Sequence, residues 1–198
     1  ASFSPVALKL DARADVRCVT MLSPDSLYLT GGGGFIRFTA NGGTTWTYQQ
    51  HRMHAPITDL IADGTRVWAA NSKNRVVMYS LDRGGFWRFP TGATFSSFWS
   101  QKYSNGGQVR GSTFALNPVY KSTIYCGLAT KVLRSRDDGE TWQSAATLPM
   151  NYNKFNAFVV SPKDSNLWLA AVGGGTVADR VYRTTNGGAD WTKTLTHD

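Results

Sequence analysis

The stretch Ser135-Arg-Asp137-Asp-Gly139-Glu-Thr-Trp142 has Ser or Thr first, Asp or Asn third, Gly fifth and Trp eighth. The pattern occurs four times in the 198 residues, and the other copies are Thr39-Ala-Asn41-Gly-Gly43-Thr-Thr-Trp46, Ser80-Leu-Asp82-Arg-Gly84-Gly-Phe-Trp87 and Thr184-Thr-Asn186-Gly-Gly188-Ala-Asp-Trp191. Successive Trp residues of the pattern are 41, 55 and 49 positions apart. Repetition at such intervals is typical of a repeat architecture, and it decides the fold class.

Three short apolar runs precede each copy, separated by turns rich in Pro, Gly, Asp and Asn. The middle run of each unit carries an aromatic residue, at Tyr28, Trp68, Tyr125 and Trp168. Each run is typical of a short buried strand, and a fourth strand is expected to begin at the Trp. Four-stranded units repeating at about 40–50 residues predict an all-β protein, a β-propeller of antiparallel blades. The units span about 16–51, 55–90, 109–148 and 155–196, within a single domain 1–198.

The turn pattern has a local physical explanation. The side chains of Asn41, Asp82, Asp137 and Asn186 can accept backbone N–H bonds from the turn that follows. The Gly two positions later can adopt a positive φ without strain from a Cβ atom. The rings of Trp46, Trp87, Trp142 and Trp191 can be buried while each indole N–H finds an acceptor. These residues are therefore interpreted as structural, and the two acids among them are removed from the catalytic candidates.

The four octets resemble Asp-box repeats, also called bacterial neuraminidase repeats, and the resemblance extends over essentially the whole chain. It implies that each octet links the third and fourth strands of a blade, away from the binding face. The copy at Ser135 fits best, whereas the first and last copies have Asn for Asp and the second has Phe86 where Thr is common. The family includes sialidases, xyloglucan-cleaving hydrolases, lectins, sortilin-type receptors and photosystem assembly factors. The resemblance therefore implies a sialidase-like fold without selecting a function.

The blade count suggests that the chain is an excerpt of a larger propeller. The alternating stretch at residues 3–11 resembles the fourth strand of a preceding blade whose turn pattern is missing. Four blades are also few for this family. The alternative is a compact four-bladed ring with an extra strand.

Composition and charge limit the partners. The net charge is +8, which attracts acidic glycans, nucleic acid or anionic surfaces, but the 21 Lys and Arg residues are scattered and nucleic acid is not expected. No run approaches the roughly 18 apolar residues of a membrane helix. Cys18 and Cys126 are expected to be free buried thiols rather than a disulfide. His51 and His54 lie three residues apart in a loop without a further ligand, so no metal or cofactor is predicted.

The longest connection between units, the insertion 88–110, is the candidate ligand-binding segment. It combines aromatic and basic side chains that can stack on sugar rings or contact a protein partner, namely Arg88, Phe98, Trp99, Lys102, Tyr103 and Arg110. The alternative interpretation is a hydrophobic plug over the junction of the second and third blades. The glycine-rich stretch from Val172 to Arg180 is expected to be a rim loop and not a phosphate-binding loop, because no Lys-Ser/Thr or helix follows it.

Carboxylates suited to catalysis are scarce. Glycosidases need two carboxyl groups across the scissile bond. The single glutamate, Glu140, lies inside a turn pattern, so the Tyr–Glu nucleophile pair of a sialidase is not expected. Asp59 stands apart because it occupies an inner-strand position, where a hydrogen-bonded rim carboxylate and a catalytic acid are both open interpretations.

The sequence favours a non-catalytic binding propeller that recognises a glycan or a protein surface, as part of a larger extracellular or virion assembly. Two alternatives stay open. One is a fragment of a glycoside hydrolase, xyloglucanase-like rather than sialidase. The other is an assembly factor or scaffold that contacts only proteins.

Overall fold

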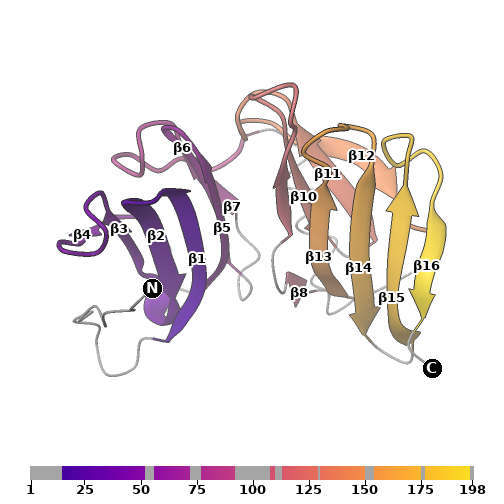
Figure 1. Cartoon of the computed structure of the whole chain (residues 1–198), viewed down its shortest axis with the longest axis horizontal. Coiled ribbons are helices and arrows are strands. Elements are labelled where there is room, and N and C mark those ends of the chain that lie inside the picture. The colour runs from indigo at the N-terminus through magenta and orange to yellow at the C-terminus, as the bar shows by residue number, and fades with distance from the viewer. Residues whose placement is uncertain are drawn as a thin grey trace.

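The computed structural model describes residues 15–51, 56–71, 77–91, 108–109, 113–128, 130–149, 154–174 and 177–196, which form four β-sheets (Figure 1). The first sheet comprises β1 (Val16–Ser23), β2 (Ser26–Gly31), β3 (Ile36–Thr39) and β4 (Thr47–Tyr48), with a 3₁₀ turn η1 (Gly32–Gly34). The second comprises β5 (Ile57–Asp63), β6 (Arg66–Asn71) and β7 (Val77–Ser80). The third comprises β9 (Phe114–Leu116), β10 (Ile124–Leu128), β11 (Lys131–Ser135) and β12 (Gln143–Thr147). The fourth comprises β13 (Lys154–Val160), β14 (Trp168–Gly174), β15 (Val177–Thr184) and β16 (Thr192–Thr196), joined by β8 (Gln108–Val109).

Within each sheet, neighbouring strands of one unit are consecutive and antiparallel, which confirms the predicted meander. Three details differ from the prediction. The fourth strands begin one residue after the Trp rather than at it, and in the second sheet this strand is reduced to a bridge between Arg88 and Tyr79. The pair Gln108–Val109, from the insertion, adds to the fourth sheet by parallel pairing with Lys154 and Phe155. A segment that precedes the third blade in the sequence therefore pairs with the first strand of the fourth blade.

The four sheets are arranged as successive blades. The first strands contact one another in order, β1 with β5, β5 with β9 and β9 with β13. Figure 1 shows the first sheet and the fourth sheet on opposite sides of the molecule, with the other two between them. Each of the three hydrophobic clusters fills one junction between neighbouring blades. Burial between blades is therefore what holds the repeats together.

Strand β6 contributes buried side chains to both junctions of the second blade, with the first blade and with the third. Val67 and Ala69 belong to the cluster between the first and second blades, whereas Trp68 and Ala70 belong to the cluster between the second and third. Because successive side chains point to opposite faces of a strand, an inner blade needs apolar residues at every position. This explains why β6 has a continuous apolar run rather than an alternating one.

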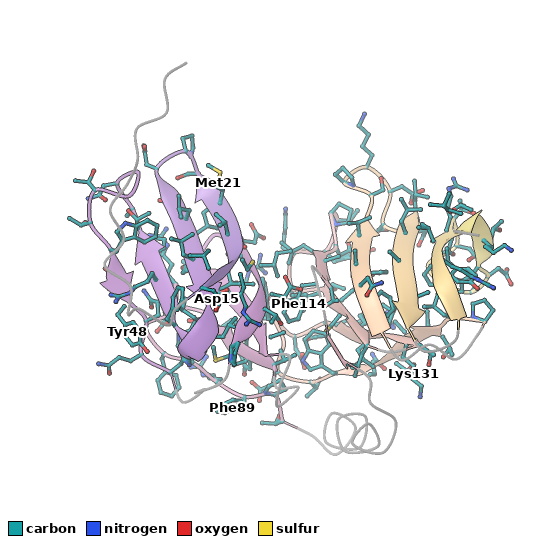
Figure 2. All side chains as sticks on the ribbon, turned by 90° about the horizontal axis from the view of Figure 1, so that it is seen from below. Asp15, Met21, Tyr48, Phe89, Phe114 and Lys131 are labelled. Carbon is teal, nitrogen blue, oxygen red and sulfur yellow. The ribbon has the colours of Figure 1, made fainter. Side chains whose placement is uncertain are left out.

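Each end blade has an apolar face that the described residues leave exposed. On β1, Val19 and Met21 are 58% and 63% exposed, and Figure 2 shows Met21 on the first blade far from Phe114, which lies near the middle of the molecule. On the fourth blade, Val159, Leu169 and Leu195 are also exposed. Exposed apolar side chains grouped on a sheet face are typical of an interaction surface.

The four turn patterns form the same hydrogen-bond network. In the copy at Ser135, the Ser135 hydroxyl accepts from the backbone N–H of Gly139 at 2.8 Å and donates to Asp137 Oδ1 at 2.7 Å. Asp137 Oδ1 in turn accepts from the N–H of Thr141 at 2.9 Å. The equivalent bonds are present around Thr39, Ser80 and Thr184. The prediction that the Asp or Asn accepts bonds within its own turn is confirmed.

In three of the turns, the Asp or Asn side chain also forms a hydrogen bond with the side chain at the seventh position. Asn41 donates its amide to Thr45 Oγ1 at 2.8 Å, and Asn186 donates to the Asp190 carboxylate at 2.9 Å. Asp137 instead accepts from the Thr141 hydroxyl at 2.5 Å. The Asn residues in the first and last copies are therefore equivalent braces and not weakened ones.

The fourth position of each turn also adopts a positive φ, which the pattern did not predict. It is occupied by Gly42, Arg83, Asp138 and Gly187, with φ of 64°, 60°, 58° and 68°. The left-handed conformation turns the carbonyls of Arg83 and Asp138 toward the preceding blade, where Tyr28 OH donates to the first at 3.1 Å and Trp68 Nε1 to the second at 2.7 Å. The aromatic residue of the middle strand thus fastens the turn of the next blade.

The tryptophans of the turns follow the prediction only in part. Trp142 is buried and donates from Nε1 to the carbonyl of Gly139 at 3.0 Å. Trp46, Trp87 and Trp191 are half-buried, and their indole N–H groups are enclosed without an acceptor among the described residues. Sequence repetition fixed the ring position, whereas the acceptor depends on what each blade packs against.

Replacement of Ser135 by Ala tests the turn network. Ser135 is 1% exposed, and its hydroxyl holds Gly139 and Asp137 at once. We expect Ser135→Ala to lower the free energy of unfolding by about 1–3 kcal/mol, because a buried N–H loses its acceptor. Urea denaturation followed by Trp fluorescence measures this. Ser144→Ala, on the exposed face of β12, is the control and should change stability by less than about 0.5 kcal/mol; equal effects would contradict the prediction.

Candidate functional site

Of the six residues predicted to contact a ligand, the structure describes one. Arg88 is exposed at the end of the second blade, with its guanidinium carbon 5.4 Å from the centre of the Phe86 ring. Phe98, Trp99, Lys102, Tyr103 and Arg110 lie outside the described residues. The insertion contacts the third blade at its beginning, where the N–H of Thr91 donates to the carbonyl of Glu140 at 2.8 Å.

Asp59 ties the second blade to the third. It is 2% exposed on β5, and its Oδ2 accepts from the backbone N–H groups of Thr113 at 2.6 Å and Phe114 at 3.0 Å, with the Thr113 hydroxyl at 3.2 Å. Burial raises the pKa of Asp59 to about 6, against the opposing effect of these hydrogen bonds. Of the two interpretations, the geometry matches a hydrogen-bonded carboxylate, because Asp59 Oδ2 accepts these bonds from the third blade.

Glu140 pairs with a tyrosine, contrary to the expectation from sequence. The Tyr79 hydroxyl donates to Glu140 Oε2, and the Thr91 hydroxyl donates to Glu140 Oε1 at 3.0 Å. The sequence did not indicate the pair because its members are 61 positions apart and belong to different blades. Burial and the Glu140 carboxylate raise the pKa of Tyr79 to about 12, which keeps the phenol protonated, and the residue is 2% exposed. This hydrogen bond ties the second blade to the third, as do the bonds of Asp59 and Trp68.

Most other described carboxylates also have structural partners. Arg66 bridges Asp63 at 2.6 Å and Asp138 at 2.9 Å, again joining the second and third blades. Hydrogen bonds from Ser80 and the N–H of Phe86 lower the pKa of Asp82. Asp137 also has a lowered pKa: burial opposes the charged form, but the bonds from Thr141 and Ser135 outweigh it. Cys18 and Cys126 are not joined by a disulfide, as predicted; Cys126 is buried, as expected, whereas Cys18 is half-buried.

A pocket of about 600 Å³ opens between the third and fourth blades. Its volume lies within the range of roughly 300–1,000 Å³ that is typical of small-ligand sites. The third blade contributes seven lining residues, which are Asn117, Tyr120, Ser122, Thr123, Tyr125, Arg134 and Arg136. The fourth blade contributes Ser165, Asn166, Trp168, Asn186 and Gly187. None of the described lining residues is an Asp or Glu.

Hydrogen bonds fix the walls of this pocket. Asn117 Oδ1 accepts from the N–H groups of Val119 and Tyr120, each at 2.9 Å, while its amide donates to Tyr125 OH at 3.0 Å. On the opposite wall, the N–H of Gly187 donates to the carbonyl of Asn166 at 2.9 Å. The loop between the first two strands of each blade is therefore held in place, and the 65% exposed ring of Tyr120 stands at the pocket.

Aromatic rings support the pocket from behind. Trp168 is 2% exposed, lies with its ring centre 4.9 Å from that of Tyr125, and donates from Nε1 to the carbonyl of Ser165 at 2.7 Å. The pocket thus combines a rigid aromatic floor with amide, hydroxyl and guanidinium groups. This composition suits a polar ligand with an apolar face, such as a sugar. Sequence reasoning missed it because its residues come from four separate segments of two blades.

The comparisons agree with the fold. No protein-family model matches the chain. A xyloglucanase of Hypocrea jecorina (strain QM6a) is 27% identical over 170 residues, which cover 81% of this chain and 19% of the xyloglucanase. An ancestral GH74 enzyme matches 90% of this chain and 25% of its own with a TM-score of 0.66 and 14% identity. YCF48 from Cyanidioschyzon merolae matches 96% of this chain and 59% of its own with a TM-score of 0.62 and 15% identity.

A structure of YCF48 bound to D1 peptide matches as well, with a TM-score of 0.53 and 11% identity over 98% of this chain and 87% of that chain. Together with the four sheets, these likenesses define the chain as a β-propeller with antiparallel blades. The chain spans about a fifth of the curated xyloglucanase that it matches.

In the described ranges, no group of three His, Cys, Asp or Glu residues is placed to hold a metal ion. None of the described segments forms a helix with the length and apolarity that crossing a bilayer requires.

Proposed function

We propose that the chain is a polysaccharide-binding segment of a larger β-propeller and that it does not cleave the polysaccharide on its own. The observation that carries the proposal is the 27% identity to a xyloglucanase over 81% of the chain. The pocket between the third and fourth blades supports it, because aromatic rings beside amide and hydroxyl side chains match the apolar face and the hydroxyl groups of a sugar.

The placement of the carboxylates supports binding without cleavage. Hydrolysis of a glycosidic bond needs two carboxyl groups that face the same bond, roughly 5–9.5 Å apart. Asp59 and Glu140 are engaged between blades, and the described pocket lining contains no carboxylate. Hydrolysis at this pocket would therefore need acids that its described lining does not supply.

The exposed faces of the end blades support membership in a larger ring. Faces in equivalent positions of the inner blades are buried against their neighbours, whereas Val19 and Met21 on β1 are exposed. A further blade of the same protein is the proposed cover, consistent with the greater length of the xyloglucanase. An intact mass of 21.7 kDa for the protein from its native source would contradict this part.

Affinity electrophoresis tests the binding proposal. We expect the chain to be retarded in gels containing at least one of a panel of cell-wall polysaccharides that includes xyloglucan and polygalacturonate, with no release of reducing ends. Tyr120→Ala should weaken the retardation severalfold, whereas Tyr48→Ala, an exposed tyrosine on the first blade, should not. Absence of retardation throughout the panel would overturn the proposal, and reducing-end release would overturn its non-catalytic part.

The insertion is proposed as a second contact region. Trp99→Ala is expected to weaken ligand binding and leave thermal stability nearly unchanged. A large loss of stability with unchanged binding would instead show that Trp99 is part of a structural plug.

A protein partner is the second candidate function, favoured by the fold shared with YCF48, which one structure shows bound to a peptide. Retention of a protein partner without any polysaccharide binding would support that candidate.

A further inference from the structure

We infer that the pocket between the third and fourth blades takes a sugar unit that carries a carboxylate, such as a uronic acid within a polysaccharide. The inference rests on the proposed function and adds the chemical class of the ligand. It follows from the positive charge of the pocket, from the Arg134 Nε–H that lacks an acceptor among the described residues, and from the hydrogen bonds that hold the pocket walls.

The charge of the pocket is uncompensated. Arg134 and Arg136 line it, and no Asp or Glu is among its described lining residues. The ion pairs of the described residues involve Arg17 and Arg66 and leave both pocket arginines without a carboxylate. A neutral sugar would not require two positive charges at one wall, whereas an anionic sugar would balance them.

Arg134 carries a donor that the described residues do not satisfy. Its side chain is half-buried on β11, and its Nε–H is enclosed without an acceptor among the described residues. An enclosed donor without a partner costs about 1–3 kcal/mol, and such groups in native proteins call for an explanation. The planar guanidinium presents parallel N–H groups that match the two oxygens of a carboxylate.

The surroundings favour a sugar as the bearer of that carboxylate. The ring of Tyr120 is exposed at the pocket, and Asn166 and Asn186 on the opposite wall offer amide groups for hydroxyls. Because hydrogen bonds hold both walls before any ligand arrives, little side-chain ordering is needed on binding.

The repeat supplies a matched control. Arg134 and Arg183 both stand immediately before the first residue of a turn pattern, on β11 and β15. Arg183 is exposed and is not among the pocket residues. Arg134→Gln and Arg183→Gln therefore remove the same charge from equivalent positions, inside and outside the pocket. A difference between them cannot come from the overall charge of +8.

The experiment measures Kd for oligogalacturonate, a xyloglucan oligosaccharide and dextran sulfate in about 0.3 M salt, where diffuse electrostatic attraction is screened. Arg134→Gln should weaken oligogalacturonate binding by about tenfold, the loss of one charge-assisted hydrogen-bonded contact. Arg134→Lys should weaken it by a smaller factor, because the charge stays and the planar fork is lost. Arg183→Gln should change it less than twofold. Arg136→Gln, at an exposed position, provides a second pocket variant whose folding is not at risk.

Several outcomes would overturn the inference. One is that the xyloglucan oligosaccharide binds as tightly as oligogalacturonate and that neither Arg134→Gln nor Arg136→Gln changes its Kd. This outcome would overturn the inference but leave the proposed function standing. Another is tighter binding of dextran sulfate with equal sensitivity to Arg134→Gln and Arg183→Gln, which would indicate a general field effect. Absence of binding to any polysaccharide would remove the proposed function together with the inference. Thermal melting of each variant verifies that it is folded.

Discussion

Gly139→Ala is expected to lower the free energy of unfolding by about 2–4 kcal/mol, because two separate costs coincide at this position. Gly139 has a φ of 101°, which an L side chain rarely adopts. A Cβ atom placed there would lie 2.8 Å from Trp68 Nε1 and 2.9 Å from Trp68 Cδ1. The indole would have to move, and its hydrogen bond to the carbonyl of Asp138 would be lost. Urea denaturation measured by Trp fluorescence gives the change.

Gly64→Ala is the matched control for this substitution. Gly64 also has a positive φ, of 64°, but a Cβ atom there would meet nothing within 4 Å. It should therefore show only the cost of the left-handed conformation, about 1–2 kcal/mol. Similar losses in the two variants would show that the contact with Trp68 does not matter and would contradict the proposed fastening of one blade to the next.

Asp59 gives the second large effect, through its bonds to the third blade. Asp59→Ala leaves the buried N–H groups of Thr113 and Phe114 without their acceptor, and we expect a loss of about 3 kcal/mol or more. Asp59→Asn keeps an oxygen that can accept the same bonds and avoids a buried charge. At pH 7.5 it should be within about 1 kcal/mol of the original chain, or more stable. Equal losses in the two variants would contradict the role of the accepting oxygen.

The pH dependence follows from the raised pKa of Asp59. With a folded pKa of about 6 and an ordinary value of 3.8, the folded chain retains a proton that the unfolded chain has released between these pH values. The stabilising contribution of this group is therefore complete below about pH 4 and is lost as the pH rises through 6. Asp82 and Asp137 act in the opposite direction, because their pKa values are lowered and their contribution is lost at acid pH.

The difference between the original chain and Asp59→Asn isolates this effect. Subtracting their unfolding free energies from pH 4 to 7.5 should give a curve that falls by about 2–3 kcal/mol with rising pH and then levels. The contribution of the two turn aspartates is common to both proteins and cancels. A flat difference curve would mean that Asp59 titrates in the folded chain as it does in the unfolded one.

The sequence predicted less of the candidate site than of the fold. The sequence correctly predicted that the aspartates of the turns accept backbone N–H bonds, because the donors lie within four residues. It did not find the pair of Tyr79 and Glu140, nor the pocket around Arg134, since their members meet only when neighbouring blades pack. Arg134 carried no local signal: the same position in the fourth unit, Arg183, is simply exposed.

The sequence by itself determined the four units, most of the strands within them and the hydrogen bonds that the Ser or Thr and the Asp or Asn form in each turn. These features depend on contacts between residues close in the chain, and a repeated octet therefore repeats them. The tertiary structure alone decided what the repeated positions do between blades. Tyr28 and Trp68 donate to the turn of the next blade, whereas Tyr125 at the equivalent position lines a pocket and its hydroxyl accepts from Asn117, because the side chains that face each junction differ from one blade to the next.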